Sequence, residues 1–387
     1  MKKILGTKVD FMVILLLFPI CIIVGKIIRY SAMKTILVDT SIGHNWIRII
    51  TSNMSYSDIL KLTVAAEQSG FAIIFYKFLN VFKLGSYTNF EIAISIIFNL
   101  IVIIMFFKCR KKISIFQAIF LLTTIVLLNL FCFCLSKEPI QILFFIIIYY
   151  ILLSHVNKKE FWCLAVIAFS AILFRKYYIL IVYYYIGAKI IVKYLTNNKE
   201  KKSYIKILFI ISLISIGYLI ILLVSKKIMP SYYNEFIRVR TRTSEAATMI
   251  SNIFNSDNIV LFVVNYLLIV LRMICPVELI LHGPKYMLYF FYQVLVSYTL
   301  IKGILDYKKS PEIKNISVLI CIAFLFTSAT FEPDFGSWIR HEIVLFPILM
   351  IINDITTKKY DNCSQASTAV STIANTNDDV YKKKDSL

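Results

Sequence analysis

The sequence is poor in charged residues and in histidine. Charged residues make up 17% of the 387 residues, and only four histidines are present. A soluble domain of this length with 59% hydrophobic residues could not cover its apolar surface with so few polar groups. The eight cysteines have no ligand spacing and few histidines to assist them, so no metal site is predicted.

Motifs for nucleotide or hydrolytic chemistry are missing as well. The chain has no Walker loop, no GxGxxG, no nucleophile elbow and no HExxH. We therefore expect no cofactor. The net charge of +20 does not indicate nucleic acid as a partner, because lysines and arginines lie mostly in short connections between apolar blocks rather than on one amphipathic face.

What the sequence does contain is a series of apolar blocks of about 15 to 23 residues, long enough to cross a hydrocarbon core of about 30 Å. We therefore predict an all-α polytopic membrane protein with about ten transmembrane helices. The first block lacks a small-residue cleavage site, so we expect a retained helix. The expected spans are 11–28, 90–107, 113–135, 140–155, 161–174, 177–192, 204–224, 286–304, 316–330 and 343–356.

Two further apolar segments, 70–84 and 259–281, would raise the number of spans to eleven or twelve. A crossing by either one would place basic clusters outside, against the positive-inside tendency, so we expect both to lie in the outer interface, 259–281 as a re-entrant or in-plane segment. This topology puts both termini in the cytoplasm and leaves two long outer segments, 29–89 and 225–285. The transmembrane domain covers 1–356, and the polar tail 357–387 is expected to be disordered.

Polar residues at three short helix connections fall on the outer face in this topology. They are Lys137 with Glu138, Arg175 with Lys176, and Arg340 with His341. Short connections hold side chains firmly, which suits the binding of a charged substrate at the membrane surface. Two other interpretations stay open: Arg175 and Lys176 as anchors attracted by lipid headgroups, and Lys137 with Glu138 as an exposed ion pair.

Three alternating arginines, Arg238, Arg240 and Arg242, occur in the second long outer segment. On an extended backbone all three would point to one side. A guanidinium binds phosphate through a planar bidentate fork, so the three together suit a diphosphate. Attraction to anionic headgroups explains them equally well.

The best candidate for a proton acceptor is His341. An imidazole titrates near neutral pH, and the adjacent Arg340 should disfavour its charged form. A neutral histidine is what a general base requires. The carboxylate alternatives, each of which could instead cap a loop, are Asp39, Glu67, Glu138 and Asp334.

Together these residues resemble those of bacterial Wzy-type polysaccharide polymerases and the related EpsG-like proteins. The resemblance rests on Glu67-Gln68-Ser69-Gly70-Phe71 with the apolar run that follows, Lys137-Glu138, Phe174-Arg175-Lys176-Tyr177-Tyr178, and Ser337-Trp338-Ile339-Arg340-His341 before Pro347. The sequence lacks the Arg-x-x-x-Ala stretch of EpsG-like members in the fourth span, where Lys137-Glu138 stands instead.

The resemblance implies a C-type glycosyltransferase bundle that works on lipid-linked sugars outside the membrane, without a nucleotide sugar. It implies that His341, Glu138 or Asp39 assists attack by a sugar hydroxyl while basic residues hold the lipid diphosphate. The residues implied in diphosphate binding are Arg175, Lys176, Arg340, Lys137, Arg238, Arg240 and Arg242.

The predicted function is polymerisation of undecaprenyl-diphosphate-linked oligosaccharide repeat units into capsular polysaccharide, O-antigen or exopolysaccharide at the outer face of a bacterial inner membrane. The expected partners are that lipid-linked oligosaccharide, membrane lipid, a chain-length regulator and a flippase. Two alternatives stay open: a lipid-sugar-dependent transferase that adds one sugar, and a flippase of the lipid-linked oligosaccharide. Few charges fall within the predicted spans, which favours an enzyme over a transporter with charged midplane sites.

Overall fold

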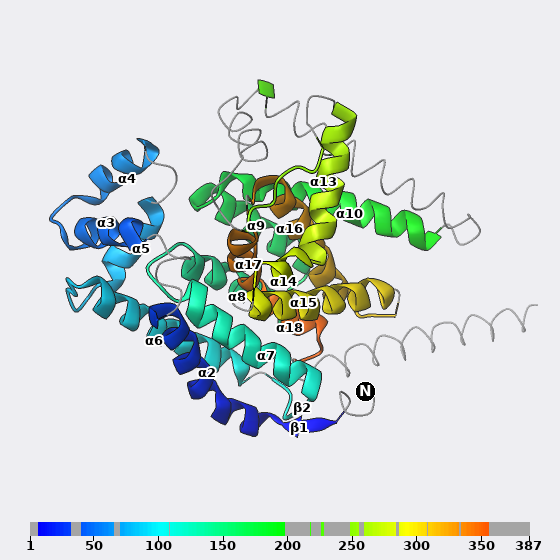
Figure 1. The fold of residues 1–387 in the computed structure, drawn as a ribbon, viewed down its shortest axis with the longest axis horizontal. Coiled ribbons are helices and arrows are strands. Elements are labelled where there is room, and N and C mark those ends of the chain that lie inside the picture. The colour runs from blue at the N-terminus through cyan, green and yellow to red at the C-terminus, as the bar shows by residue number, and fades with distance from the viewer. Residues whose placement is uncertain are drawn as a thin grey trace, which may run out of the picture.

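The computed structural model is a bundle of helices, which confirms the predicted all-α polytopic membrane class (Figure 1). Among the described residues, five helices are long and apolar enough to cross a membrane: α2 (Phe11–Ser31), α6 (Tyr87–Phe106), α7 with the π-helix η1 (Ile115–Leu127 and Leu128–Cys132), α15 (Met287–Leu305) and α16 (Glu312–Phe331). The structure describes residues 7–31, 40–65, 70–107, 109–197, 217, 226–227, 248–254, 259–283, 286–307, 309–332 and 334–355.

Three more predicted spans coincide with helices α8 (Glu138–Leu153), α9 (Lys159–Leu173) and α10 (Ile179–Asn197). The helices α8 and α9 have 16 and 15 residues, fewer than the about 17 residues that a helix needs to cross a bilayer. The predicted span 204–224 and the tail 357–387 lie outside the described residues, residue 217 excepted. The number of ten spans therefore stays a prediction.

The last predicted span, 343–356, is wrong in its bounds. In its place stand α17 (Phe335–Ile343) and α18 (Phe346–Ile352), which are bent by 68° relative to each other. Pro347 lies in the first turn of α18, where its missing N–H costs nothing. In the middle of one continuous helix the same proline would remove a hydrogen bond and clash with the preceding turn. The break places Arg340 and His341 on a short helix of their own.

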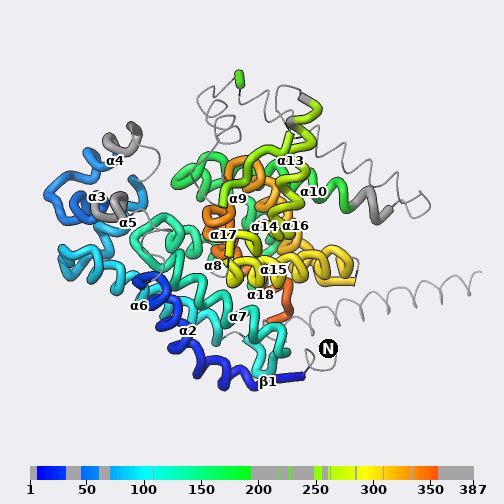
Figure 2. The backbone as a smooth tube through the Cα atoms, viewed as in Figure 1, coloured from blue at the N-terminus to red at the C-terminus, as the bar shows by residue number. Residues whose placement is uncertain are grey.

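The first long segment contains α3 (Thr40–Thr51), α4 (Tyr56–Ala65) and α5 (Gly70–Leu79), which lie together at one side of the bundle (Figure 2). The ammonium of Lys77 on α5 donates to the carbonyl oxygens of Ser52 and Met54, at 2.7 and 2.8 Å, in the connection between α3 and α4. Lys77 therefore fixes the three helices to one another.

The second long segment ends in a broken helix. α13 (Ile259–Ile274) and α14 (Glu278–Leu281) are separated at Pro276, and the Arg272 guanidinium pairs with the carboxylate of Glu278 across the break. The same guanidinium donates to the carbonyl oxygen of Ser251 at 2.6 Å. A broken helix is compatible with the re-entrant segment expected at 259–281. The position of this segment relative to a membrane stays a prediction.

A short antiparallel pair of strands, which the all-α prediction did not include, joins the start of α2 to the connection between α6 and α7. β1 (Lys8–Asp10) pairs with β2 (Lys112–Ser114). Three residues give too few alternating positions to be recognised in a sequence. At the same end, the backbone N–H of Arg110 donates to the carbonyl oxygen of Ile355 after α18, at 2.9 Å. The beginning of α2 and the end of α18 therefore lie at one end of the bundle.

Close packing aligns the long helices. Helix α2 packs on α7, α16 packs on α10 and α18, and α8 packs on α9 and α18. At Gly25 on α2, an added Cβ would come within 2.6 Å of the Val126 carbonyl oxygen, so only glycine permits this approach. Helices α2, α7 and α16 all begin at the end that holds β1 and β2. A helix of 20 residues is about 30 Å long. The other ends of these helices therefore lie about that far from the strands, close to the beginning of α8.

Candidate functional site

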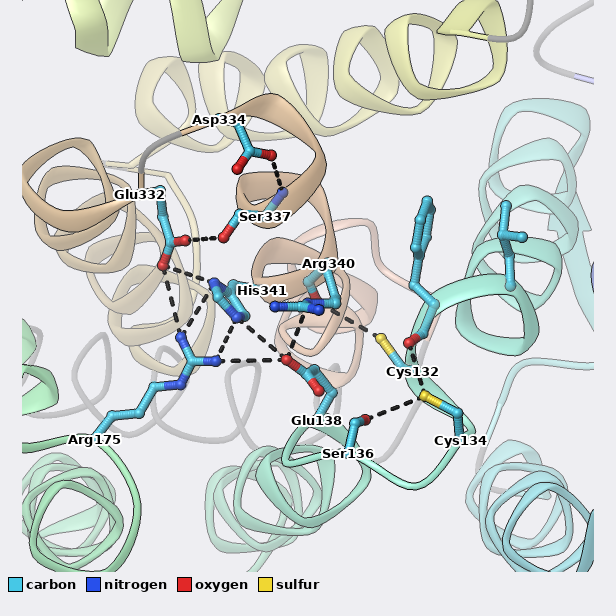
Figure 3. A network of polar contacts seen from close by, with 12 residues as sticks. Cys132, Cys134, Ser136, Glu138, Arg175, Glu332, Asp334, Ser337, Arg340 and His341 are labelled. Atoms are coloured by element: carbon cyan, nitrogen blue, oxygen red, sulfur yellow. Dashed lines mark hydrogen bonds and ion pairs between the residues drawn. The ribbon is translucent and has the colours of Figure 1, made fainter. Parts of the chain in front are cut away.

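Five charged or titratable side chains from separate elements converge at the end of the bundle opposite the strands (Figure 3). Glu138 is the first residue of α8, and Arg175 precedes the 3-10 helix η2 (Lys176–Tyr178). Glu332 follows α16, and Arg340 and His341 lie in the last turn of α17. The structure thus brings together residues from all three predicted connections. We call these five residues the cluster.

Glu138 is the carboxylate at which both arginines of the cluster meet. It is 2% exposed. Its Oε1 atom lies 3.1 Å from Nε of Arg340, 3.5 Å from Nη2 of Arg175 and 3.3 Å from Nε2 of His341. Because Glu138 is buried, the interpretation of Lys137 with Glu138 as an ion pair at an exposed site is wrong.

Glu332 is the second carboxylate of the cluster, and the sequence analysis did not identify it. Its Oε1 atom lies 2.7 Å from Nδ1 of His341 and 3.7 Å from Nη1 of Arg175. The hydroxyl of Tyr177 donates to the same oxygen at 3.3 Å, and the hydroxyl of Ser337 donates to Oε2. Both carboxylate oxygens are therefore fixed by neighbours.

The charges around Glu332 keep it ionised. Burial alone would raise its pKa, but His341 and Arg175 and the donated hydrogen bonds lower the pKa to about 2. Asp334 shows the opposite balance, since burial raises its pKa above the ordinary value. Glu332 is thus a stable anion at any physiological pH.

The two arginines differ in exposure. The side chain of Arg175 is 11% exposed and that of Arg340 is 37% exposed. Arg175 contacts both carboxylates, and its guanidinium also lies 5.7 Å from the ring centre of Tyr177. Arg340 contacts Glu138 through Nε. Arg175 therefore organises the interior of the cluster, while Arg340 is the arginine that a ligand can reach.

The position of Glu138 follows from an interruption in the preceding helix. After α7 the chain forms the π-helix η1 and then leaves helical geometry until Glu138, which leaves backbone carbonyls without helical partners. Two cations of α2 satisfy them. Arg29 Nη1 donates to the carbonyl oxygen of Leu130 at 2.9 Å, and Lys26 Nζ donates to that of Phe133 at 2.7 Å.

The beginning of α17 is fixed by its N-cap. The Asp334 carboxylate accepts from the backbone N–H of Ser337 at 2.8 Å, a standard capping bond. Asp334 also forms an isolated antiparallel bridge with Met249, and the N–H of Phe335 donates to the carbonyl oxygen of Thr248 at 3.0 Å. Thr248 and Met249, which belong to the second long segment, therefore lie beside the beginning of α17.

The other predicted site residues lie outside the cluster or outside the described part of the chain. Lys176 is exposed, and Lys137 is half-buried at the N-cap of α8. In the described part of the chain, Lys176 forms no hydrogen bond or ion pair with the cluster. The remaining candidates lie outside the described residues, namely Asp39, Glu67, Arg238, Arg240 and Arg242.

The cluster has the components of acid and base chemistry on an anionic substrate. It combines two guanidinium groups, two carboxylates and one imidazole in a largely buried place, where electrostatic interactions are stronger than in water. Among the described residues, no group of three or more His, Cys, Asp or Glu side chains is placed to hold a metal ion.

Comparison with known proteins gives no relative on which to base an assignment. No protein-family model, no curated protein and no solved structure matches the chain. The interpretation of the cluster therefore depends on its geometry and on the chemistry of its side chains.

Proposed function

We propose that the chain is a membrane glycosyltransferase that polymerises polyprenyl-diphosphate-linked oligosaccharide repeat units at the outer face of a bacterial inner membrane. The observation that carries the proposal is the cluster itself. It places an accessible guanidinium, Arg340, beside a buried imidazole, His341, at one end of a bundle of apolar helices.

The charges at the two ends of the bundle support the outward orientation. The end that holds the strands carries exposed lysines from several connections, and a basic end is expected to face the cytoplasm. The cluster lies at the opposite end and balances its arginines with carboxylates. The exposed lysines are Lys8, Lys111, Lys112, Lys158, Lys302 and Lys309.

The proposed reaction displaces polyprenyl diphosphate from a sugar. A hydroxyl of one repeat unit attacks the anomeric carbon of another, and the bond from that carbon to the diphosphate oxygen breaks. The diphosphate leaves with the electron pair, and His341 accepts the hydroxyl proton. Arg340 stabilises the charge that develops on the departing diphosphate, which is where a fixed donor contributes most to the rate.

The placement of charge favours an enzyme over a flippase. Transporters usually bind charged substrates near the bilayer midplane, on broken helices. Arg340 and His341 do lie on a broken helix pair, α17 and α18, but in the described residues the cluster lies at the level of helix ends, with Glu138 at the beginning of α8 and Glu332 just after α16. A substrate at that level would meet the cluster without crossing the membrane.

Deletion of the gene tests the proposal. We expect long polysaccharide to disappear while complete single repeat units accumulate on the lipid at the outer leaflet. Complete repeat units confined to the inner leaflet would indicate a flippase. Repeat units that lack one sugar would indicate a transferase of single sugars. Either result would overturn polymerisation.

A further inference from the structure

We infer that Glu332 is the positioning residue of the cluster, fixing His341 as the neutral tautomer with its proton on Nδ1, so that Nε2 is the atom that accepts the substrate proton. The inference rests on the proposed function. It assigns a role to a carboxylate that the sequence analysis did not single out, and it separates that role from the role of Glu138.

The tautomer follows from the partners of the two ring nitrogens. Nδ1 of His341 lies 2.7 Å from Oε1 of Glu332, a carboxylate whose oxygens already accept from the hydroxyls of Tyr177 and Ser337, so Nδ1 must donate. Nη2 of Arg175 contacts Nε2, and a guanidinium can only donate, so Nε2 must accept. A ring with protons on both nitrogens would point an N–H at the guanidinium.

Two further contacts compete with this assignment. Oε1 of Glu138 lies 3.3 Å from Nε2 of His341 and would accept a proton placed there, but Oε1 of Glu332 lies closer to Nδ1, at 2.7 Å, and Oε1 of Glu138 is also shared by both arginines. Nη1 of Arg175 lies 3.2 Å from Nδ1 of His341, where it could also donate. Nη1 has other acceptors, since it contacts the Tyr177 hydroxyl and lies 3.7 Å from Oε1 of Glu332. Nδ1 has no acceptor as close as Glu332. The proton is therefore best placed between Nδ1 and Glu332.

The surroundings of Glu332 make it suited to orient the ring. It is 3% exposed, and donors from three directions hold its two oxygens: Tyr177, Ser337 and His341. A carboxylate that is itself held cannot follow small movements of the imidazole. The ring consequently keeps Nε2 on the side of Glu138 and the accessible Arg340.

The two carboxylates then act differently in the proposed reaction. Glu332 orients His341 before the reaction and stabilises the imidazolium that forms when Nε2 takes the proton. Glu138 lies 3.1 Å from Nε of Arg340 and holds that guanidinium beside Nε2. For Nε2 to take the proton of the attacking hydroxyl, Nη2 of Arg175 must turn from Nε2 to Oε1 of Glu138, which lies 3.5 Å away. Glu332 is thus needed for the base, and Glu138 for the anion-binding arginine.

The direct test is nitrogen NMR of the full chain in lipid nanodiscs, labelled with ¹⁵N-histidine. The chain has only four histidines, so the His341 signals can be assigned by their absence in His341→Gln. We expect the neutral ring of the wild type to show a protonated Nδ1 and an unprotonated Nε2. A wild-type spectrum with the proton on Nε2 would overturn the inference without any variant being needed.

Two variants distinguish loss of the hydrogen bond between Glu332 and Nδ1 of His341 from a general loss of folding. Glu332→Ala should lose the preference for the Nδ1 proton and elongate chains about 100-fold more slowly, the usual contribution of an oriented general base. Ser337→Ala removes only the hydroxyl that donates to Oε2 of Glu332, leaves the bond from Nδ1 to Oε1 in place, and should keep the tautomer. Glu160→Gln, in an exposed pair with Lys189, is the matched control for loss of a carboxylate and should change neither.

Activity is measured with lipid-linked oligosaccharide extracted from the deletion strain as the probe, at equal amounts of folded protein. If His341→Gln elongates chains normally, the base assigned under the proposed function is wrong. If His341→Gln is inactive while Glu332→Ala keeps both the tautomer and the rate, only the role of Glu332 is wrong. The two failures are therefore distinguishable.

Discussion

Replacement of Arg340 with lysine tests the proposed anion site most directly. In the structure Nε of Arg340 lies 3.1 Å from Oε1 of Glu138, while the side chain is 37% exposed. A guanidinium can hold Glu138 with Nε and still present its terminal N–H groups to a diphosphate. A lysine has one ammonium group at the end of a flexible chain, so it can serve the carboxylate or the ligand but not both in a fixed geometry.

The expected magnitude follows from what the guanidinium contributes in the transition state. Loss of one preorganised donor to a group that gains charge costs about 2.7 to 4 kcal/mol, which is about 100-fold to 1000-fold in rate. A helix anchor at the membrane surface would lose far less, because lysine fulfils that role as well as arginine does. The size of the effect therefore decides between an anion-binding residue and an anchor.

The assay compares the rate of elongation and the distribution of chain lengths in membranes adjusted to equal amounts of folded protein, because loss of protein would imitate loss of activity. The matched control is Arg48→Lys, at an exposed position on α3 away from the cluster. We expect Arg340→Lys to make only short chains and Arg48→Lys to make chains of normal length. Normal long chains from Arg340→Lys would refute the assignment of Arg340 to the diphosphate.

Three further predictions follow from the same contacts. Arg175→Gln should lower the free energy of unfolding by about 3 to 5 kcal/mol, because it removes the cation that two buried carboxylates share; unchanged thermal unfolding in detergent would contradict this. The pKa of Glu332 is about 2 in the folded chain and about 4.3 when unfolded, so the stabilisation by its charge is present above about pH 4.3 and is lost as the pH falls toward 2. Between pH 5 and pH 3 the melting temperature of Glu332→Gln should therefore fall less than that of the wild type. An equal fall in both proteins would contradict this. A topology reporter fused after Lys112 should report the cytoplasm and one fused within 238–245 the exterior, and reversed signals would place the cluster on the inner side.

Much of the fold could be predicted because long apolar runs have few alternatives. Helices α2 and α16 lie where hydropathy placed them, since about 20 apolar residues between charged connections can only be buried or cross a membrane. The sequence also indicated the connections at Glu138, Arg175 and His341 as places with unusual polar residues, and the structure brings all three together. Their chemical roles stay predictions.

Glu332 could not be identified from the sequence because its importance depends on a turn. It sits between Phe331 and Pro333, where a carboxylate after an apolar span is expected to cap a loop. Only the reversal of the chain between α16 and α17 brings it back against His341, nine positions later in the sequence. The one local signal was an acidic residue on each side of Pro333, which marks a tight connection without saying what it contacts.

The side chains of α2 that hold the connection before Glu138 show how a site can depend on residues that no sequence motif would include. Backbone that leaves helical geometry within an apolar bundle must find other hydrogen-bond partners, because lipid provides none. Here α2 supplies them: Arg29 donates to the carbonyl oxygen of Leu130 while the Glu91 carboxylate of α6 holds the same guanidinium at 2.6 Å. A single ion pair between two spans therefore fixes the path of the chain that ends in Glu138. Arginine and glutamate far apart in the sequence thus determine where the carboxylate of the cluster lies, and hydropathy, which treats both as interruptions of an apolar block, has no means of pairing them.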